Sequence, residues 1–199
     1  GSKVSTKIGV ITSLIKKVDN LIIVGAMANN FIKFKGIKVG KSLIEPGSEI
    51  VIKEIFKNAD RHNCKIISPI DFAVSDSTDG NARLKELENV EKNEIILDIG
   101  PETIRNISKI IDKSKTVLWN GPAGYFENKN FSKGTTSIAE KISNNTNTAS
   151  LLSIVGGGDT ISAIKNNALD LKFTHLSTAG GAFLEYIEGK NLPGIEVLK

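Results

Sequence analysis

The chain has 199 residues, enough for one large domain or two small ones, and a chain of this length buries roughly 70% of the surface that it exposes when unfolded. Its net charge of +4 is spread along the sequence without a basic tail, which argues against nucleic-acid binding. The single cysteine, Cys64, excludes an internal disulfide, and no apolar run is long enough to span a bilayer. We expect a cytoplasmic monomer with no membrane or nucleic-acid partner.

Short apolar runs alternate with stretches of helical periodicity, a pattern typical of a parallel sheet with helices on both faces. The predicted strands, in chain order, are 21–25, 65–69, 95–99, 116–120, 151–155 and 173–177. The predicted helices are 4–18, 27–34, 48–63, 102–112, 132–144, 160–167 and 182–188, and the polar stretch 75–93 is predicted to be an excursion between strands. We predict a single domain over 1–199 with a three-layer α/β/α fold and a six-stranded parallel Rossmann-like sheet.

Glycine-containing segments follow four of the predicted strands. They are Gly25, Gly121 with Gly124, 156–158, and Gly180 with Gly181. Because the carboxyl ends of parallel strands share one edge, where ligands bind, these segments predict a ligand site at that edge. Neither G-x-x-x-x-G-K-[ST] nor a G-x-G-x-x-G that opens a helix occurs, so the site would be a phosphate cradle of another kind.

The string G-G-G-D-T at 156–160 follows an apolar run and opens an amphipathic stretch. Glycines permit positive φ and close backbone approach, so amide groups at a helix N-terminus can converge there on an anion. Asp159 would repel a phosphate unless a cation stood between them, which predicts Mg²⁺ at this residue. The same string is also compatible with an ordinary tight turn between a strand and a helix.

The segment 117–127, V-L-W-N-G-P-A-G-Y-F-E, resembles the W-N-G-P-x-G-x-F-E motif of phosphoglycerate kinases. Further matches follow in the order of that family, at 1–7, 25–28, 97–102, 156–160, 175–182 and 184–194. The resemblance covers the whole chain, and it is to the nucleotide-binding, C-terminal half of the family. Two positions depart from the common pattern: Ala26 stands where some members have glycine, and Ala179 replaces the first glycine of Ser-Thr-Gly-Gly-Gly-Ala.

The resemblance implies a role for each matching residue. An apolar adenine slot should be formed by Gly25, Ala26, Leu43 and Leu97. The nucleotide should run along Asn120, Gly121 and Pro122, and its ribose hydroxyls should donate hydrogen bonds to Glu127. The phosphates should meet Lys7 and the backbone of Gly156, Gly157, Gly158 and Thr160, with Mg²⁺ on Asp159. The phosphoryl group in transfer should face Lys3, Gly180 and Gly181.

The resemblance also implies an activity, the reversible transfer of a phosphoryl group between 1,3-bisphosphoglycerate and ADP in glycolysis. The family's N-terminal half, which binds the phosphoglycerate, has no counterpart in this sequence. We therefore expect the chain to bind MgADP or MgATP without turnover. A nucleotide-binding module that has no catalytic role stays open as an alternative. A dinucleotide oxidoreductase is disfavoured, because no acidic ribose ligand follows the first glycine-rich turn.

Overall fold

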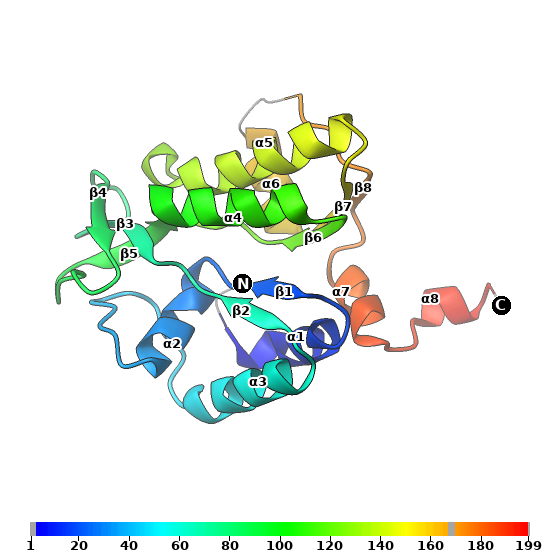
Figure 1. Cartoon of the computed structure of the whole chain (residues 1–199), viewed down its shortest axis with the longest axis horizontal. Coiled ribbons are helices and arrows are strands. Elements are labelled where there is room, and N and C mark those ends of the chain that lie inside the picture. Colours follow the sequence, from blue (N-terminus) through cyan, green and yellow to red (C-terminus); the bar gives the residue numbers. More distant parts are fainter. Residues whose placement is uncertain (1–2, 167–169, 199) are drawn as a thin grey trace.

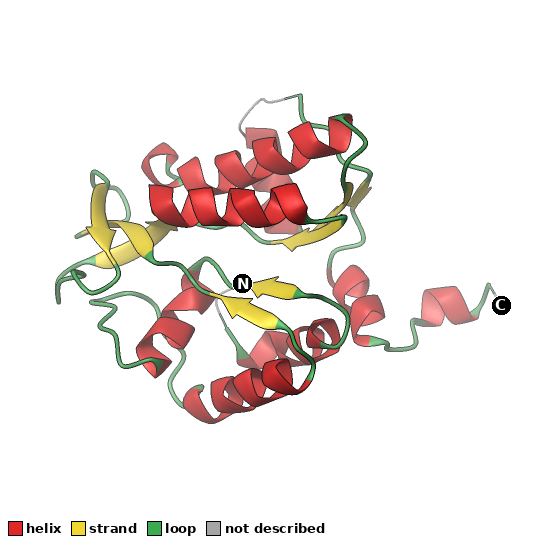
Figure 2. Ribbon diagram, viewed as in Figure 1, coloured by secondary structure: helices red, strands yellow, loops and turns green. Residues whose placement is uncertain are grey.

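A computed structural model describes residues 3–166 and 170–198 of the chain. Its strands lie in a middle layer between helices (Figure 1, Figure 2). The elements, in chain order, are η1 (Ser5–Lys7), α1 (Ile8–Ile15), β1 (Asn20–Ile22), α2 (Ala26–Phe34), α3 (Glu49–Arg61), β2 (Lys65–Ile67), β3 (Asp71–Ser75), β4 (Arg83–Glu86), β5 (Ile95–Ile99), α4 (Pro101–Lys113), β6 (Thr116–Asn120), η2 (Lys129–Phe131), α5 (Lys133–Asn147), β7 (Leu152–Gly156), α6 (Gly158–Asn166), β8 (His175–Ser177), α7 (Gly181–Glu188) and α8 (Pro193–Glu196). The prediction of an α/β fold is confirmed.

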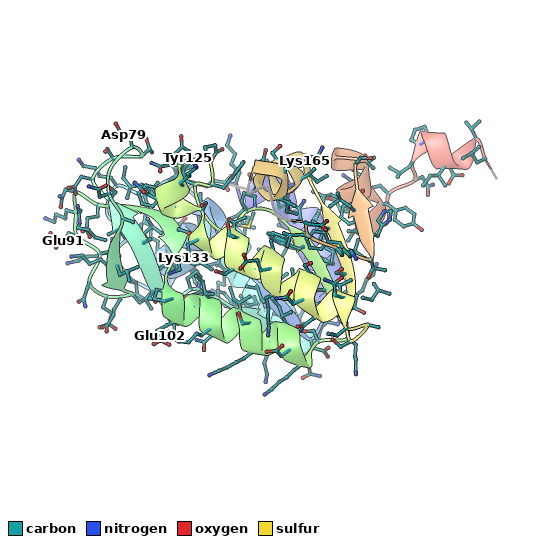
Figure 3. The ribbon with its side chains drawn as sticks, turned by 90° about the horizontal axis from the view of Figure 1, so that it is seen from above. Asp79, Glu91, Glu102, Tyr125, Lys133 and Lys165 are labelled. Carbon is teal, nitrogen blue, oxygen red and sulfur yellow. The ribbon has the colours of Figure 1, made fainter. Side chains whose placement is uncertain are left out.

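The helices divide between the two sides of the strand layer. Helices α4, α5 and α6 pack side by side on one side, and a view from above shows them over the strands (Figure 3). Helices α1, α2 and α3 cover the other side, α7 packs against α1, and α8 extends away from the body of the molecule (Figure 1). Within the described ranges, no helix has the length and apolar character needed to cross a membrane.

Two large hydrophobic clusters fill the spaces between these layers, and a third, small cluster contains Ala73, Leu97 and Phe131. The first lies between α1, α2 and α3 and includes Val4, Phe31 and Ile52, all fully buried. The second lies between α4, α5 and the strands β6 and β7, and includes Trp119 and Val155. Helices α3 and α4 each turn one face to their cluster, because buried residues recur every three or four positions along them.

All seven predicted helices and all six predicted strands form, although the predicted end of the sixth helix, residue 167, lies outside the described residues. The prediction of a single six-stranded parallel sheet is wrong. Hydrogen bonds group the strands into a parallel pair β1–β2, an antiparallel sheet β4–β3–β5 and a parallel sheet β6–β7–β8. Strand β5 was expected among the parallel strands, but it runs antiparallel to β3.

The two strands that the pattern missed account for the antiparallel sheet. Strand β3 lies directly after the predicted strand 65–69, and all five of its residues are buried. Strand β4 lies inside the stretch predicted to be an excursion, because its sequence, R-L-K-E, is largely charged and three of its four residues are exposed. A charged edge strand gives little apolar signal, and its pairing with β3 is visible only in three dimensions.

Asp71 on β3 holds the start of α4. The N-cap of that helix is Gly100, which has no side chain to cap it. The Asp71 carboxylate accepts hydrogen bonds from the backbone N–H groups of Glu102 and Thr103, at 2.9 and 2.7 Å, and from the Thr103 hydroxyl at 2.6 Å. A Cβ at Gly100 would collide with this carboxylate, so a glycine is needed there. The cap therefore ties the antiparallel sheet to α4.

Replacing Asp71 by Ala should lower the free energy of unfolding by about 1–3 kcal/mol, because the buried Thr103 N–H and the part-buried Glu102 N–H at the start of α4 lose their acceptor. Urea unfolding measures this change. The control is Asp60→Ala at an exposed position on α3, which should change stability by less than about 0.5 kcal/mol. Equal effects of the two substitutions would contradict the capping role.

Candidate functional site

One cavity lies where the N-termini of α6 and α7 meet, at the carboxyl ends of β6 and β7. Its volume is about 230 Å³. The lining residues are Lys7, Asn120, Gly121, Gly157, Gly158, Asp159, Thr160, Gly180, Gly181 and Leu184. Every one of these except Leu184 was predicted as a site residue. Leu184 is buried on α7, and its apolar type at a helical position gives no signal beyond core packing.

The junction between Asn120 and the turn after β7 shapes the floor of this cavity. Asn120 is paired with Gly156 in the parallel register, and its Nδ2 donates a hydrogen bond to the Gly156 carbonyl at 2.8 Å. Gly157 has a φ of 98°, and a Cβ there would collide with Asn120 Nδ2. A glycine is therefore required at 157, both for the backbone conformation and for the close approach of the asparagine.

The first turn of α6 presents polar groups to the cavity. Gly158 begins the helix, and Asp159 is exposed beside it. Thr160 is only 1% exposed, and its Oγ1 has no hydrogen-bond partner among the residues that the structure describes. A buried hydroxyl without a partner costs about 1–3 kcal/mol, so this position favours a ligand that supplies the missing hydrogen bond.

The start of α7 brings a second helix N-terminus to the same cavity. Gly180 is the N-cap, with a φ of 56°, and Gly181 begins the helix. Apart from the neighbouring residues and the helix's own backbone, no atom of the described residues lies within 4 Å of the place that a Cβ would occupy at Gly158, Gly180 or Gly181, so the backbone there is open. Free amides and the positive ends of two helix dipoles favour an anion between them.

Lys7 adds a positive charge at the cavity, whereas Asp159 adds a negative one. The described residues contain no group of three or more His, Cys, Asp or Glu side chains that could hold a metal. A cation at Asp159 would therefore take most of its ligands from a bound phosphate and from water, which is how Mg²⁺ is usually held beside phosphates. The donors present fit a magnesium ion that arrives with a phosphorylated ligand.

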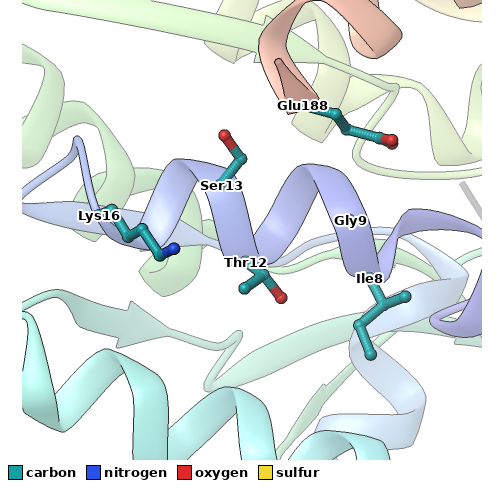
Figure 4. Close-up of a pocket in the computed structure, with 6 residues that line it drawn as sticks. All are labelled: Ile8, Gly9, Thr12, Ser13, Lys16 and Glu188. Carbon is teal, nitrogen blue, oxygen red and sulfur yellow. The ribbon is translucent and has the colours of Figure 1, made fainter. Parts of the chain in front are cut away.

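A larger hollow, of about 400 Å³, lies between α1 and the end of α7 (Figure 4). None of the predicted site residues lines it. The two helices approach closely here, since a Cβ at Gly9 would lie 2.9 Å from Glu188 Cδ. The Ser13 hydroxyl also donates to the Ile187 carbonyl at 2.7 Å. This packing fixes α1, and with it Lys7 at its N-cap, relative to α7.

The residues predicted for the base do not line the first cavity, the one of about 230 Å³. Gly25 is the N-cap of α2 with a φ of 67°, and its Cβ position lies 3.1 Å from the Pro122 carbonyl, so the two loops are adjacent. Ala26 follows Gly25 and is half-buried. Leu43 is 59% exposed, and its carbonyl accepts a hydrogen bond from Asn29 at 3.1 Å. Their roles in an adenine slot stay predictions.

Five further predicted residues also do not line the cavity, and one of them is the half-buried Pro122 beside Gly25. Leu97 is buried on β5, and its carbonyl accepts a hydrogen bond from the Tyr125 N–H at 2.6 Å. Gly156 ends β7, where a Cβ would lie 2.5 Å from the ring of Phe183. Lys3 and Glu127 are exposed. The structure thus brings the predicted phosphate residues together more closely than the predicted base and ribose residues.

Asp98, next to Leu97 on β5, binds the first turn of α5 and lies against Gly124 in the loop that follows β6. Its carboxylate accepts hydrogen bonds from the N–H groups of Gly134 and Ile99, at 2.7 and 2.9 Å. A Cβ at Gly124 or at Gly134 would collide with it. Burial raises the pKa of Asp98 to about 7, although the two N–H groups oppose this rise. Sequence reasoning included Asp98 in a motif but gave it no role.

The fold and the cavity together have the chemistry of an α/β phosphate-binding protein, and comparison with known proteins identifies the family. A family model described as phosphoglycerate kinase matches residues 1–190. The phosphoglycerate kinases of Orientia tsutsugamushi (strain Boryong) and Wolbachia sp. subsp. Brugia malayi (strain TRS) are 47% and 43% identical to this chain over 201 residues. Each alignment covers 100% of this chain and 50% of the relative.

A solved structure agrees with these relatives. The phosphoglycerate kinase of Coxiella burnetii superposes with a TM-score of 0.93 at 41% identity, over 100% of this chain and 51% of that one. The chain belongs to the phosphoglycerate kinase family. It spans about half the length of the curated relatives it matches.

The buried carboxyl of Asp98 gives a prediction for stability against pH. Because its pKa is raised on folding, the native state holds a proton that the unfolded state releases between about pH 4 and pH 7. This group therefore makes the free energy of unfolding fall as the pH rises through that range. Asp98→Asn cannot titrate, so its stability relative to the unaltered chain should rise by up to roughly 4 kcal/mol over the same range.

Urea unfolding at several pH values between about 4 and 7.5 measures this difference for Asp98→Asn. Asp60→Asn, at an exposed position, serves as the control, and its stability should stay parallel to that of the unaltered chain. A constant difference between Asp98→Asn and the unaltered chain across the whole range would show that Asp98 is already ionised at acid pH.

Proposed function

We propose that residues 1–199 form the nucleotide-binding, C-terminal half of a phosphoglycerate kinase that transfers a phosphoryl group reversibly between 1,3-bisphosphoglycerate and ADP, giving 3-phosphoglycerate and ATP in glycolysis. One observation carries the proposal: two helix N-termini and Lys7 surround a cavity in which the Thr160 hydroxyl has no partner among the described residues. Family membership supports the same reading. The N-terminal half, which would bind the phosphoglycerate, is the proposed partner of this chain.

In this proposal, the nucleotide phosphates bind the open amides of Gly158 and Thr160, and Lys7 neutralises part of their charge. The Thr160 hydroxyl gains its missing partner from a phosphate oxygen. Asp159 holds the Mg²⁺ that accompanies the nucleotide, and the metal supplies further neutralisation of phosphate charge when it is bound. The base and ribose lie towards the loops that carry Gly25 and Glu127.

The proposed reaction needs few catalytic groups from the protein. The acceptor of the phosphoryl group is either ADP or a carboxylate oxygen, and the carboxylate is already a competent nucleophile, so no general base is needed. Catalysis then consists of alignment and of charge stabilisation around the group in transfer. We assign the charge stabilisation to Lys3 and to the open backbone at Gly180 and Gly181.

The first expected outcome concerns the chain on its own. It should bind MgADP in a calorimetric titration, and it should show no turnover with ATP and 3-phosphoglycerate. Alignment of two reactants is worth roughly 7–11 kcal/mol of the barrier, and the surface that aligns the phosphoglycerate is proposed to lie in the other half. Kinase activity in a preparation free of longer enzyme would contradict this division of roles, and binding without any turnover after addition of the other half would favour a non-catalytic module.

The second expected outcome concerns Asp159. Asp159→Asn keeps the shape of the side chain but removes its charge, so the variant should bind ADP with little dependence on Mg²⁺, whereas the unaltered chain should show a clear dependence. Titrations with ADP in the presence of Mg²⁺ and of a chelator measure both affinities. Asp60→Asn is the matched control and should respond to Mg²⁺ like the unaltered chain. If the ADP affinity of Asp159→Asn depends on Mg²⁺ as strongly as that of the unaltered chain, Asp159 does not hold the metal and is only a turn residue.

A further inference from the structure

Glu45, in the loop between α2 and α3, joins that loop to the start of the chain. Its Oε2 accepts hydrogen bonds from the backbone N–H groups of Val4, at 2.7 Å, and Ser5, at 3.1 Å. Its Oε1 accepts a hydrogen bond from the Ser5 hydroxyl. The hydrogen bond from the Ser5 hydroxyl, those from the two backbone N–H groups and the charge of Lys3 lower the pKa of Glu45, so it is ionised at neutral pH.

The loop that carries Glu45 is itself held by α2. Two consecutive buried asparagines on that helix bind its backbone: Asn30 Oδ1 accepts from the Glu45 N–H at 2.7 Å, and Asn29 Nδ2 donates to the Leu43 carbonyl at 3.1 Å. The Ser48 hydroxyl also donates to Asn30 Oδ1 at 3.4 Å. Glu45 therefore approaches the start of the chain from a fixed support.

The segment on which Glu45 acts leads directly to the cavity. Val4 is fully buried in the first hydrophobic cluster, and the Lys7 N–H donates to the Val4 carbonyl at 3.0 Å, which closes the short turn η1. Lys7 ends this turn and lines the cavity. The backbone at one end of η1 is thus bound by Glu45, and the side chain at the other end faces the proposed phosphate site.

Glu45 does not act on a ligand directly. It does not line the cavity, and both of its carboxylate oxygens are already occupied by donors from Val4 and Ser5. Any effect of Glu45 on binding must therefore pass through the segment that it holds. Without the carboxylate, two backbone N–H groups at the start of η1 and the Ser5 hydroxyl would lose their acceptor. The turn would then be held by its own short-range hydrogen bonds, such as that from the Lys7 N–H to the Val4 carbonyl, and by the packing of Val4.

We propose that Glu45 is a positioning residue for the nucleotide: by binding the backbone of Val4 and Ser5, it holds η1 in the conformation that presents Lys7 to the phosphates. The inference rests on the proposed function. The loop that carries Glu45 would contact both ends of the nucleotide, because Glu45 lies two residues after Leu43, which we place at the base. Movement of this one loop would change the base and phosphate contacts together.

A double-mutant cycle tests whether Glu45 acts through Lys7. The affinity for MgADP is measured by calorimetry for the unaltered 199-residue chain, Glu45→Ala, Lys7→Ala and the double variant. Lys7→Ala should weaken binding about tenfold, the size expected for one hydrogen bond to a charged group. Glu45→Ala should weaken it about three- to tenfold, and the double variant should bind no more weakly than Lys7→Ala by itself.

Two further variants make the test specific. Glu45→Gln keeps an oxygen that can accept the backbone N–H groups, so it should restore most of the affinity that Glu45→Ala loses. Glu49→Ala removes an exposed acid from the first turn of α3 and should leave the affinity unchanged. If Glu45→Ala does not fold, Ser5→Ala takes its place in the cycle: it removes one donor to Glu45 and should cause a smaller loss that also disappears in the Lys7→Ala background.

The outcomes separate this inference from the proposed function. If the unaltered chain does not bind MgADP, the proposed function fails and the role of Glu45 fails with it. If the unaltered chain and Glu45→Ala bind MgADP equally well, or if the losses from Glu45→Ala and Lys7→Ala multiply in the double variant, only the positioning role is overturned. A loss in Glu45→Ala that vanishes when Lys7 is absent, together with recovery in Glu45→Gln, supports the positioning role.

Discussion

The contact between Asn120 and the turn at Gly156 and Gly157 is the constraint on which the cavity depends. It joins the ends of β6 and β7 through a side-chain hydrogen bond, and it leaves no room for a Cβ at 157. The chain therefore turns sharply and enters α6 with its first amides uncovered. The positions of Asp159 and Thr160 in the first turn of α6 follow from this turn.

At three sites, a carboxylate from a distant segment binds backbone N–H groups that a local cap would otherwise bind. Asp71 binds the start of α4, Glu45 binds the start of η1, and Asp98 binds the backbone at Gly134. In each case an acceptor reaches N–H groups that the local sequence leaves without a side-chain cap. Two of these acids, Glu45 and Asp98, adjoin the segments proposed to bind the nucleotide.

Sequence patterns predicted what is local and missed what depends on distant contacts. The apolar runs of β6 and β7 and the buried face of α3 are visible as periodicity, so these elements could be predicted. The direction of β5 could not, because it is set by its pairing with β3, and β4 is too charged to be read as a strand. Glycines followed by Asp159 marked the phosphate cavity, but a loop glutamate that binds the backbone 40 residues away, as Glu45 does at Ser5, carries no local signal.

The cavity is lined by residues from segments that are anchored in two different hydrophobic clusters. Lys7 follows Val4, which belongs to the first cluster. Asn120 ends β6 and Thr160 lies on α6, and other residues of this strand and this helix pack in the second cluster. The part of the molecule around each cluster has its own strands: among the described residues no hydrogen bond joins β1 to β6, and the two parts meet through side-chain packing, such as that of Ile22 and Val24 against the second cluster. Each part is a candidate for opening as a separate cooperative unit. A ligand that contacts residues of both parts would raise the free energy needed to open either part. Occupancy of one small cavity would therefore make the two parts unfold together.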